Sequence, residues 1–399
     1  MTQHNILLAI GGGIAAYKCC ELTRLLRQQD HAVKVIMTEA ATRFITPLTL
    51  QALSGQPVGH DLFADEQSHG MGHIKLARWA DVLVVAPATC DLLAKFSHGL
   101  ADDLVSTLYL ACQAPVILAP AMNQAMWQHP ATQANIERLK SYGAALVGPE
   151  SGEQACGEQG AGRMAEPTNL AAAIQRQLLP KPLAGQRVMI TAGPTREPLD
   201  PVRFISNLSS GKMGYALAQA ALDYGAQVDL VSGPVAITPP PGIQLWPAQT
   251  AQDMLQHVTT LAPQCDLFIA AAAVADYTPA HRASQKIKKH ATELNLTLTK
   301  TVDIVAHVAQ MPTRRPFTVG FAAETEHLED YALNKLNSKK LDMIIANHVG
   351  GRHGGFERDD NAATVYWHHG QRHFELQSKQ LLAYQLLTLI TEHHARHST

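Results

Sequence analysis

Two side chains that can transfer protons, His73 and Cys156, stand in glycine-rich surroundings in the first half of the chain. His73 precedes an apolar helical pattern, and a helix start favours the neutral imidazole that accepts a proton. Cys156 lies at the centre of Ser151–Met164, whose four glycines predict a loop that can cover a site. Free cysteines are usually buried in cores, so a chemical role is favoured for Cys156, whereas a lone histidine is more often structural.

Two predicted strands end in small and polar residues, at 86–89 (APAT) and 120–123 (PAMN). Each ending places one hydroxyl or amide at the edge of a sheet, where a flat ring could lie on the backbone. Asp91 and Asn123 are also good helix N-caps, so a purely structural role stays open for both. We favour a chemical role more strongly for Asn123, because no polar turn precedes it.

The segment Arg187–Gly214 is predicted to bind an anion. A strand, Arg187–Thr191, leads into a long polar segment, and a helix, Lys212–Tyr224, follows. Free backbone N–H groups at such a helix start attract phosphate. The phosphate-loop pattern G-x-x-x-x-G-K-[ST] is not met, because Ser206 replaces its first glycine and Met213 its final hydroxyl residue. The segment therefore indicates a phosphate or nucleotide loop of another kind.

Apolar strands alternate with helical patterns in the first half, which predicts a parallel sheet covered on both faces, with ligands at the carboxyl ends of the strands. The second half repeats this α/β pattern and ends with a β-ribbon. The predicted strands are Asn5–Ile10, Ala32–Met37, Asp81–Ala86, Pro115–Ala119 and Ala144–Val147, then Arg187–Thr191, Gln227–Ser232, Leu267–Ala272, Thr318–Phe321 and Met343–Ala346. The predicted helices of the first half are Ile14–Gln29, Pro47–Leu53, Asp91–Phe96, Asp102–Ala111 and Ala131–Tyr142.

The first strand is followed by Gly11-Gly12-Gly13 and Ile14-Ala15-Ala16, which fits the dinucleotide pattern G-x-G-x-x-A. The second strand ends in Met37-Thr38 instead of an acid that would bind a ribose. A hydroxyl suits a phosphate better, so these residues favour FMN over NAD. A nicotinamide-dependent oxidoreductase built on the same loop remains the main alternative.

In the second half, Asp276 at a strand end is suited to hold Mg²⁺ or a ribose, or it is a turn carboxylate. Basic clusters follow two strands and favour a triphosphate, although charge runs are usually solvated. They comprise Lys286, Lys288 and Lys289, and Lys335, Lys339 and Lys340.

Composition limits the class of protein. A chain of 399 residues favours two domains, and a net charge of −2 argues against nucleic-acid binding. The six cysteines form no C-x-x-C pair, which excludes the usual zinc and dithiol motifs and favours a reducing, cytoplasmic setting. The apolar runs are too short to span a membrane. The 20 histidines include many near the end of the chain and indicate a solvated surface more than a metal site.

The motifs together resemble a family, the bifunctional flavoproteins of coenzyme A synthesis in which phosphopantothenoylcysteine decarboxylase is fused to phosphopantothenate–cysteine ligase. The resemblance covers almost the whole chain. Its marks are GGGIAAYK (11–18), GHI (72–74), APAT (86–89), PAMN (120–123), ACG and GRM around Cys156, ITAGPTREPLDPVRFISN (190–207), SSGKMG (209–214), AAVADY (272–277), KIKK (286–289) and GFAAET (320–325).

The resemblance implies a flavodoxin-like FMN-dependent decarboxylase domain (1–180) and a Rossmann-like CTP-dependent ligase domain (185–399). It implies that His73 is the decarboxylase base, that Asn123 binds the substrate carboxylate, and that Cys156 donates a proton. It also implies that Asn207 and Lys286 serve ligation. The implied FMN contacts are Gly12, Gly13, Thr38, Thr89 and Ser106, and the implied CTP contacts are Asp276, Lys286, Asp303, Ile304, Phe321, Lys335 and Lys339, with Mg²⁺ on the phosphates.

The sequence departs from the family pattern at three places. Gly11 stands where serine is common, Leu208 replaces a polar residue, and Thr301-Val302-Asp303 replaces Asn-Pro-Asp. The family further implies a dodecamer, with trimers from the flavin half and dimers from the ligase half. A second alternative is a non-catalytic flavin-binding regulatory protein, in which His73 and Cys156 would be dispensable.

Overall fold

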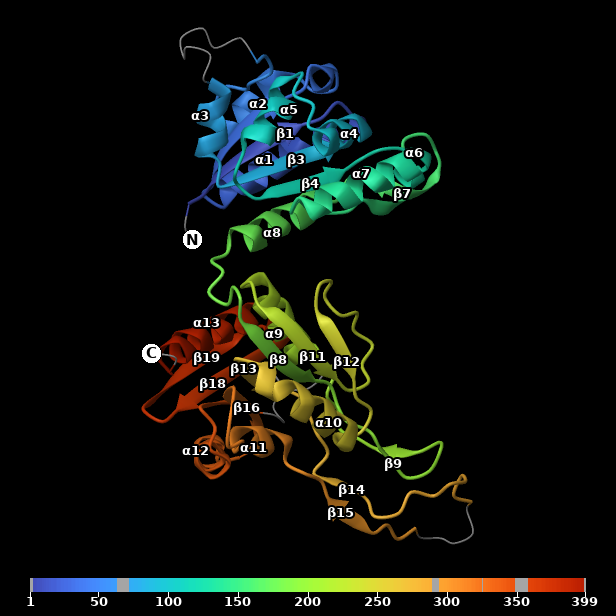
Figure 1. Ribbon diagram of the computed structural model, residues 1–399, viewed down its shortest axis with the longest axis vertical. Helices are drawn as coiled ribbons and strands as arrows, with labels where there is room; N and C mark the ends of the chain where they lie inside the picture. Colours follow the sequence, from blue (N-terminus) through green and yellow to red (C-terminus); the bar gives the residue numbers. More distant parts are fainter. Residues whose placement is uncertain (1–2, 63–71, 289–293, 325, 349–357, 398–399) are drawn as a thin grey trace. The chain divides into compact units, whose positions relative to one another are not determined.

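The computed structural model describes residues 3–62, 72–288, 294–324, 326–348 and 358–397, and it divides into two compact units, Met1–Leu179 and Pro180–Thr399 (Figure 1). Lys289, one of the basic residues noted above, lies outside the described residues.

The first unit is built on a parallel sheet with strand order β2-β1-β3-β4-β5. This is the flavodoxin-like doubly wound order, and it confirms the predicted fold class. Each of these strands begins and ends close to the range predicted from the sequence. The strands are β1 (Asn5–Ile10), β2 (Ala32–Met37), β3 (Val82–Ala88), β4 (Val116–Pro120) and β5 (Ala145–Leu146).

Helices cover both faces of this sheet because successive side chains of a strand point to opposite sides. Ile6 and Leu8 of β1 pack in one core with α1, α2 and α8, whereas Leu7 and Ala9 pack in another with α4, α5 and α7. The helices are α1 (Lys18–Gln28), α2 (Pro47–Ser54), α3 (Gly72–Trp79), α4 (Cys90–His98), α5 (Leu104–Ala111), α6 (Gln124–Gln128), α7 (Pro130–Ser141) and α8 (Pro167–Leu178).

Local structure differs from the sequence-based expectation at three points. The first predicted helix begins as a 3-10 turn, η1 (Ile14–Tyr17), before α1. The cap of α4 is Thr89, so Asp91 lies in the first turn instead. The glycine-rich segment around Cys156 is an antiparallel hairpin, β6 (Glu150–Glu153) and β7 (Gln159–Arg163), rather than an irregular loop.

The second unit contains an eight-stranded sheet with the order β12-β11-β8-β13-β16-β17-β18-β19. Its parallel part has the Rossmann-like order, and an antiparallel β-ribbon, β18–β19, extends it as predicted. The strands are β8 (Arg187–Ala192), β11 (Gln227–Ser232), β12 (Gln244–Pro247), β13 (Leu267–Ala270), β16 (Phe317–Glu324), β17 (Met343–His348), β18 (Asp360–Trp367) and β19 (Gly370–Ser378).

Two small ribbons lie outside this sheet: β9 (Glu197–Pro198) with β10 (Phe204–Ile205), and β14 (Tyr277–Pro279) with β15 (Leu298–Lys300). The first lies within the long segment that joins β8 to the next helix. The helices of this unit are α9 (Lys212–Asp223), α10 (Ala251–Leu261), α11 (Ile304–Ala309), α12 (Leu328–Lys339) and α13 (Lys379–His397).

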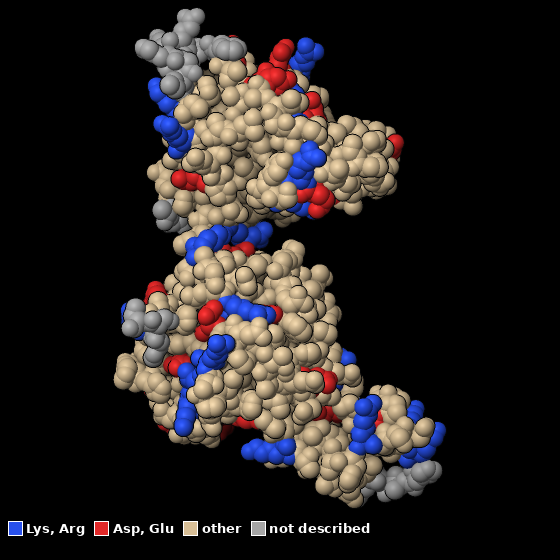
Figure 2. All heavy atoms as spheres, in the orientation of Figure 1, with Lys and Arg blue, Asp and Glu red and all other residues tan. Residues whose placement is uncertain are grey.

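Basic and acidic side chains are interspersed over the face drawn in Figure 2, mostly in small groups separated by uncharged surface. The two kinds of side chain are nearly equal in number, 32 basic and 34 acidic, which gives the net charge of −2. Within the described part of the chain, none of the helices combines the length and apolar character needed to cross a membrane.

Candidate active sites

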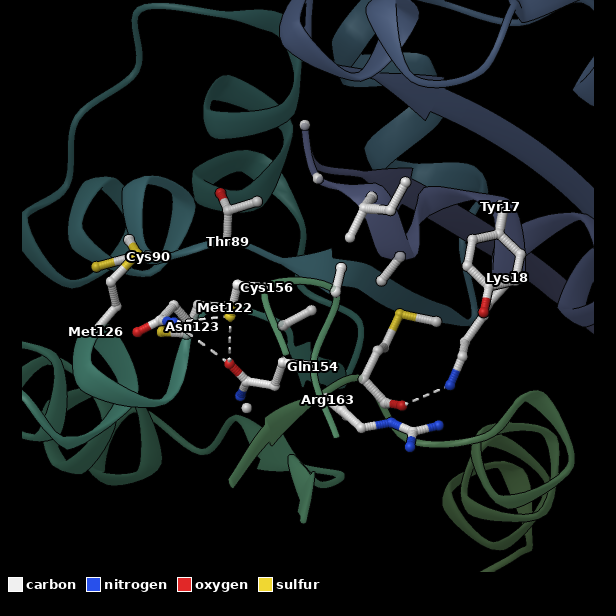
Figure 3. Close-up of a pocket in the computed structure, with 18 of the residues that line it drawn as sticks. Tyr17, Lys18, Thr89, Cys90, Met122, Asn123, Met126, Gln154, Cys156 and Arg163 are labelled. Atoms are coloured by element: carbon white, nitrogen blue, oxygen red, sulfur yellow. Dashed lines mark hydrogen bonds between the residues drawn. The ribbon is translucent and has the colours of Figure 1, made fainter. Parts of the chain in front are cut away.

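A cavity of about 710 Å³ opens at the carboxyl ends of the strands of the first unit (Figure 3). Its wall comes from η1 and the start of α1, from the ends of β3 and β4, and from the β6–β7 hairpin. The structure thus brings together Gly12, Gly13, Thr89, Asn123 and Cys156, which are far apart in the sequence. The other lining residues include Tyr17, Lys18, Cys90, Met122, Met126, Gln154, Arg163 and Met164.

The Gly11–Gly13 turn fits tightly against β3. The Gly11 N–H donates to Pro87 O at 3.2 Å, and a Cβ atom at position 11 would lie only 2.4 Å from the same oxygen. A side chain at position 11 would therefore require the end of β3 to shift. Thr89 Oγ1 accepts the Leu92 N–H at 3.3 Å as the cap of α4, which leaves its own hydroxyl hydrogen available to a ligand.

Asn123 caps a helix and also lines the cavity. Its Oδ1 accepts the Ala125 N–H at 2.8 Å and caps α6, while its Nδ2 points into the cavity toward the hairpin. This Nδ2 donates to Glu158 at 2.7 Å and lies 3.5 Å from Cys156 Sγ. The cap fixes the side chain, so the amide and the exposed thiol of Cys156 face the same space.

Close backbone contacts seat the hairpin over the cavity. Met122 N–H donates to Gly162 O at 2.9 Å, and a Cβ at position 162 would lie 2.2 Å from Met122 O. Gly162 also has a positive φ of 148°, which strains any other residue. The glycines therefore permit a close fit of the hairpin against the β4–α6 connection, and this fit places Cys156.

Lys18 anchors the end of the same hairpin. Its side chain is buried, and its ammonium donates to Met164 O at 3.0 Å and to Glu166 at 2.7 Å. A buried ammonium needs such partners. The bond joins the start of α1 to the chain just after β7, so it fixes the hairpin relative to the glycine turn.

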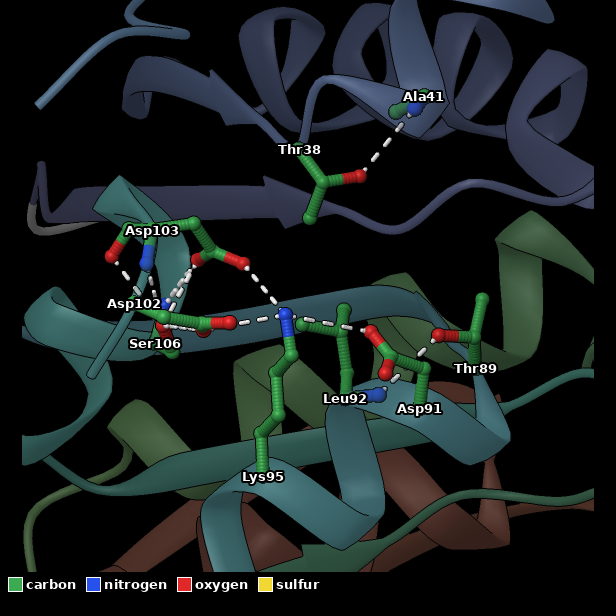
Figure 4. A network of polar contacts seen from close by, with 9 residues as sticks. All are labelled: Thr38, Ala41, Thr89, Asp91, Leu92, Lys95, Asp102, Asp103 and Ser106. Carbon is green, nitrogen blue, oxygen red and sulfur yellow. Dashed lines mark hydrogen bonds and ion pairs between the residues drawn. The ribbon is translucent and has the colours of Figure 1, made fainter. Parts of the chain in front are cut away.

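A polar network joins the starts of α4 and α5 (Figure 4). Lys95 Nζ lies 3.5 Å from Asp91, 3.1 Å from Asp102 and 3.2 Å from Asp103. Burial opposes its charge, but hydrogen bonds to Asp102 and Asp103 outweigh burial and raise the pKa of Lys95. Ser106 completes a capping box with Asp103 and is fully buried.

Three predicted residues of the flavin half lie outside the cavity wall. Thr38 is nearly buried, and its Oγ1 accepts the Ala41 N–H at 3.2 Å. Ser106 is held in its capping box. His73 is half-buried at the start of α3, which packs against α5, and it does not line the cavity that holds Asn123 and Cys156.

The second unit has a cavity of about 220 Å³ at the carboxyl ends of its central strands. The start of α9 contributes Ser209 to Gly214, and the end of β13 and the following residues contribute 271–274. Phe321 of β16 also lines it. The wall is completed by Ala323, Asn347, Asn361 and Lys379.

Asn207 lies beside this cavity and is held by the backbone. Its Nδ2 donates to Ala273 O at 2.6 Å, and its Oδ1 accepts the Ser209 N–H at 3.2 Å. Ala273 and Ser209 both line the cavity. The amide of Asn207 therefore links the two loops that form the wall, because its nitrogen and its oxygen each make a hydrogen bond to one of them.

Four of the other residues implied for CTP lie on or beside α11 and α12, whereas Asp276 precedes β14 and Lys286 lies between β14 and β15. Asp303 caps α11 and pairs with Lys339 at 2.8 Å; burial opposes the charge of Asp303, but the lysine and the Ala306 N–H hold its pKa below the ordinary value. Ile304 is buried, and Lys335 lies one turn before Lys339 on α12. Asp276 and Lys286 are exposed.

Sequence reasoning did not identify Lys18, Asn361 or Lys379 as lining residues. Asn361 is 4% exposed, and its Oδ1 has no hydrogen-bond partner among the described residues. Lys379 is buried, and burial followed by the nearby Lys212 lowers its pKa. A buried amide and a buried lysine in the final part of the chain carry no local pattern that would mark them.

Residues 1–179 match the Flavoprotein family, and residues 183–393 match the DNA/pantothenate metabolism flavoprotein C-terminal domain. Together with the two doubly wound units, these matches define a flavoprotein domain followed by a second α/β domain. The chain is 51% identical over 388 residues to the coenzyme A biosynthesis bifunctional protein CoaBC of Vibrio vulnificus, which covers 97% of each chain. The chain belongs to the family of coenzyme A biosynthesis bifunctional proteins, as the sequence motifs predicted.

Two further relatives carry the same name. The protein of Escherichia coli is 50% identical over 387 residues, covering 96% of this chain and 95% of its own. The protein of Bacillus subtilis is 44% identical over 392 residues, covering 97% and 96%.

Among solved structures, the C-terminal domain of a CoaBC protein is 39% identical and covers 53% of this chain and 97% of its own, with a TM-score of 0.46. A PPC decarboxylase mutant complexed with pantothenoylaminoethenethiol is 32% identical, covering 44% and 97%, with a TM-score of 0.40.

Proposed function

We propose that this protein carries out two steps of coenzyme A synthesis. The second unit (185–399) joins cysteine to 4′-phosphopantothenate at the expense of CTP, and the first unit (1–180) decarboxylates the product to 4′-phosphopantetheine. The observation that carries the proposal is the gathering of Asn123 and Cys156 around one cavity, with Asn207 at the edge of another. Full-length similarity to proteins named for coenzyme A biosynthesis supports both halves.

The residues of the first cavity fit FMN. A volume of about 710 Å³ lies within the usual range of cofactor sites, roughly 300–1,000 Å³. Gly12, Gly13 and Thr89 offer backbone and hydroxyl donors at one end, and we propose that Thr38 and Ser106 support this end from behind. When bound, FMN supplies a reversible two-electron acceptor, without which the substrate would lose CO₂ to an unstabilised carbanion.

The protein side chains then transfer protons and orient the substrate. His73 takes the proton of the substrate thiol, Asn123 hydrogen-bonds the carboxylate that leaves as CO₂, and Cys156 returns a proton to carbon. The second and third roles agree with the distance of 3.5 Å between Asn123 Nδ2 and Cys156 Sγ. His73 lies outside this cavity, so we propose that a neighbouring subunit completes the site, within a dodecamer of trimers and dimers.

In the ligase half, the carboxylate, itself a poor electrophile, attacks the α-phosphate of CTP, displaces pyrophosphate and becomes an acyl-cytidylate. We propose that Lys286, Lys335 and Lys339 stabilise the phosphates, while Asp303, the backbone of Ile304 and Phe321 contact the nucleotide. Among the described residues, no group of three or more His, Cys, Asp or Glu side chains could hold a metal ion. Exposed Asp276 fits a Mg²⁺ ion that is held mainly by phosphate oxygens.

Incubation of the purified protein with 4′-phosphopantothenate, cysteine, Mg²⁺ and either CTP or ATP tests the proposal. Mass analysis should show 4′-phosphopantetheine with CTP, and the protein should carry the yellow absorption of bound flavin. A colourless protein with NADPH-dependent turnover would instead support the oxidoreductase alternative.

Sedimentation at assay concentration checks the proposed dodecamer. All six cysteines are free in the structure, which supports our placement of the reaction in a reducing cytoplasm.

Replacing Lys95 should weaken FMN binding. Lys95→Met leaves three carboxylates facing one another at the starts of α4 and α5, and the cap of α5 is then disturbed. A cap contributes about 1 kcal/mol, and loss of this contribution from the FMN-bound state would raise the FMN dissociation constant about fivefold. Flavin fluorescence titration measures this constant. Lys95→Arg should restore it, and Lys140→Met, which removes an exposed pair on α7, should leave it unchanged.

A further inference from the structure

The segment that carries Lys286 has no regular structure of its own. Residues 280–297 connect β14 to β15, and their described part, 280–288 and 294–297, contains no helix or strand. The side chain of Lys286 is exposed. An exposed lysine on an irregular segment samples many conformations, and contacts of the neighbouring backbone limit where its side chain begins.

Those contacts come from Asp200 and Arg203, in the turn between β9 and β10. Asp200 Oδ2 accepts the N–H of Ile287, the residue directly after Lys286, at 3.1 Å. The guanidinium of Arg203 donates to Ile287 O and lies 3.2 Å from Asp200 Oδ2. Both backbone polar groups of Ile287 are therefore held by one ion pair.

The turn that provides this clamp is itself well defined. Asp200 Oδ1 accepts the Val202 N–H at 2.7 Å and the Arg203 N–H at 2.8 Å, in the manner of an Asx turn. Asp200 is 2% exposed; burial opposes its charge, but three backbone N–H groups and Arg203 keep its pKa below the ordinary value. The Ala283 N–H also donates to Leu199 O at 2.9 Å.

The base of the same hairpin leads into the loop that carries Asn207. Ser206 Oγ donates to Thr195 O at 2.7 Å, and Asn207 Nδ2 donates to Ala273 O. One short ribbon, β9–β10, thus ties the Lys286 segment at its tip to the cavity loop at its base. The two residues proposed to serve ligation are on segments joined by this ribbon.

We propose that Asp200 is a positioning residue of the ligase half, which acts by holding the backbone beside Lys286 through Ile287 and Arg203. This inference rests on the proposed function, in which Lys286 serves acyl-cytidylate formation. Asp200 itself contacts no substrate in the proposed reaction, and its effect passes entirely through Lys286. Fixing the backbone lowers the conformational freedom that Lys286 loses when the phosphates bind.

A double-mutant cycle tests the proposal. Asp200→Asn keeps the shape of the side chain but places an amide N–H against the Ile287 N–H and removes the charge that pairs with Arg203. The kcat of CTP-dependent pyrophosphate release should fall by about 10- to 100-fold. In a Lys286→Gln background, Asp200→Asn should change this rate by less than about twofold, because the residue through which it acts is absent.

Asp342→Asn is the matched control. Asp342 likewise accepts a backbone N–H, from Thr318 at 2.6 Å, and pairs with Arg315 at 2.9 Å, but it lies at the amino-terminal ends of β16 and β17. Any effect of this variant should be the same factor in both backgrounds. Hydrogen exchange should show faster exchange of the Ile287 amide in Asp200→Asn and no change in Asp342→Asn.

A wild-type rate in Asp200→Asn, or an equal loss with and without Lys286, would overturn the positioning role. Should Asp200→Asn fail to fold, Ile287→Pro removes the same hydrogen bond from the other side and should give the same non-additive loss. Wild-type turnover in Lys286→Gln alone would contradict the proposed function of Lys286, and the exchange of the Ile287 amide would still report separately whether Asp200 holds the segment.

Discussion

Cys156→Ser should still release CO₂ from phosphopantothenoylcysteine but should accumulate a product that lacks two hydrogen atoms relative to the normal thiol. The exposed thiol lies 3.5 Å from Asn123 Nδ2, at the tip of a hairpin held by Lys18 and Gly162. A serine hydroxyl keeps this position but is a far weaker acid. Because proton donation contributes typically 10²- to 10⁴-fold, formation of the thiol product should fall by about this factor. Mass spectrometry with parallel CO₂ detection separates the two steps.

Cys112→Ser serves as the control for this prediction. Cys112 ends α5 outside the cavity, and burial raises the pKa of its thiol, so it is poorly suited to donate or accept a proton at neutral pH. Its replacement should leave both CO₂ release and thiol formation at the wild-type level. Normal thiol formation in Cys156→Ser would remove this residue from the reductive step, and loss of CO₂ release would mean that it acts earlier.

Asn207→Asp should trap the acyl-cytidylate and stop ligation. The change replaces an amide that donates to Ala273 O at 2.6 Å by a carboxylate oxygen, which repels that carbonyl and adds negative charge beside the phosphates. Activation by CTP should continue, because the proposed lysines are unaffected. Attack by cysteine should slow by about 10²- to 10³-fold, the usual cost of losing one oriented donor. A quenched reaction analysed by mass spectrometry should show the activated acid.

Gln244→Glu adds the same charge to the same unit on the edge strand β12 and should ligate normally. If Asn207→Asp turned over fully, Asn207 would have no role in the second half-reaction. If instead it released no pyrophosphate, its role would lie in activation by CTP, before the acyl-cytidylate forms.

Much of the architecture could be predicted because it depends on short-range pattern. Apolar runs such as Asn5–Ile10 can only be buried on both faces of a sheet, and helices between such runs force parallel pairing. Folds of this kind bind ligands at the carboxyl ends of their strands, and Thr89 and Asn123, which follow two such ends, line a cavity there. The helix cap was harder to predict: the sequence offered Asp91 as the N-cap of α4, and the structure has Thr89 in that position.

The glycines around Cys156 led to a wrong prediction: the sequence indicated an irregular loop, and the structure has a hairpin. Four glycines in one segment indicate freedom of the backbone, yet Gly162 is required by a close approach to Met122, which lies 40 residues earlier in the sequence. The segment is therefore a hairpin that packs closely against the β4–α6 connection. A pattern within the segment contains no information about the surface on which it lies.

The sequence by itself determined the order of elements, the strand ends at which the cavities open, and the family, since each follows from residue types at short spacing. Only the tertiary structure decided which distant groups meet. Lys18 and Met164 are 146 positions apart, and Asp200 and Ile287 are 87 apart. Such contacts arise when whole elements pack, and each adds a single hydrogen bond that leaves no periodic trace in the sequence. The position of Cys156 and the proposed position of Lys286 both depend on contacts of this kind.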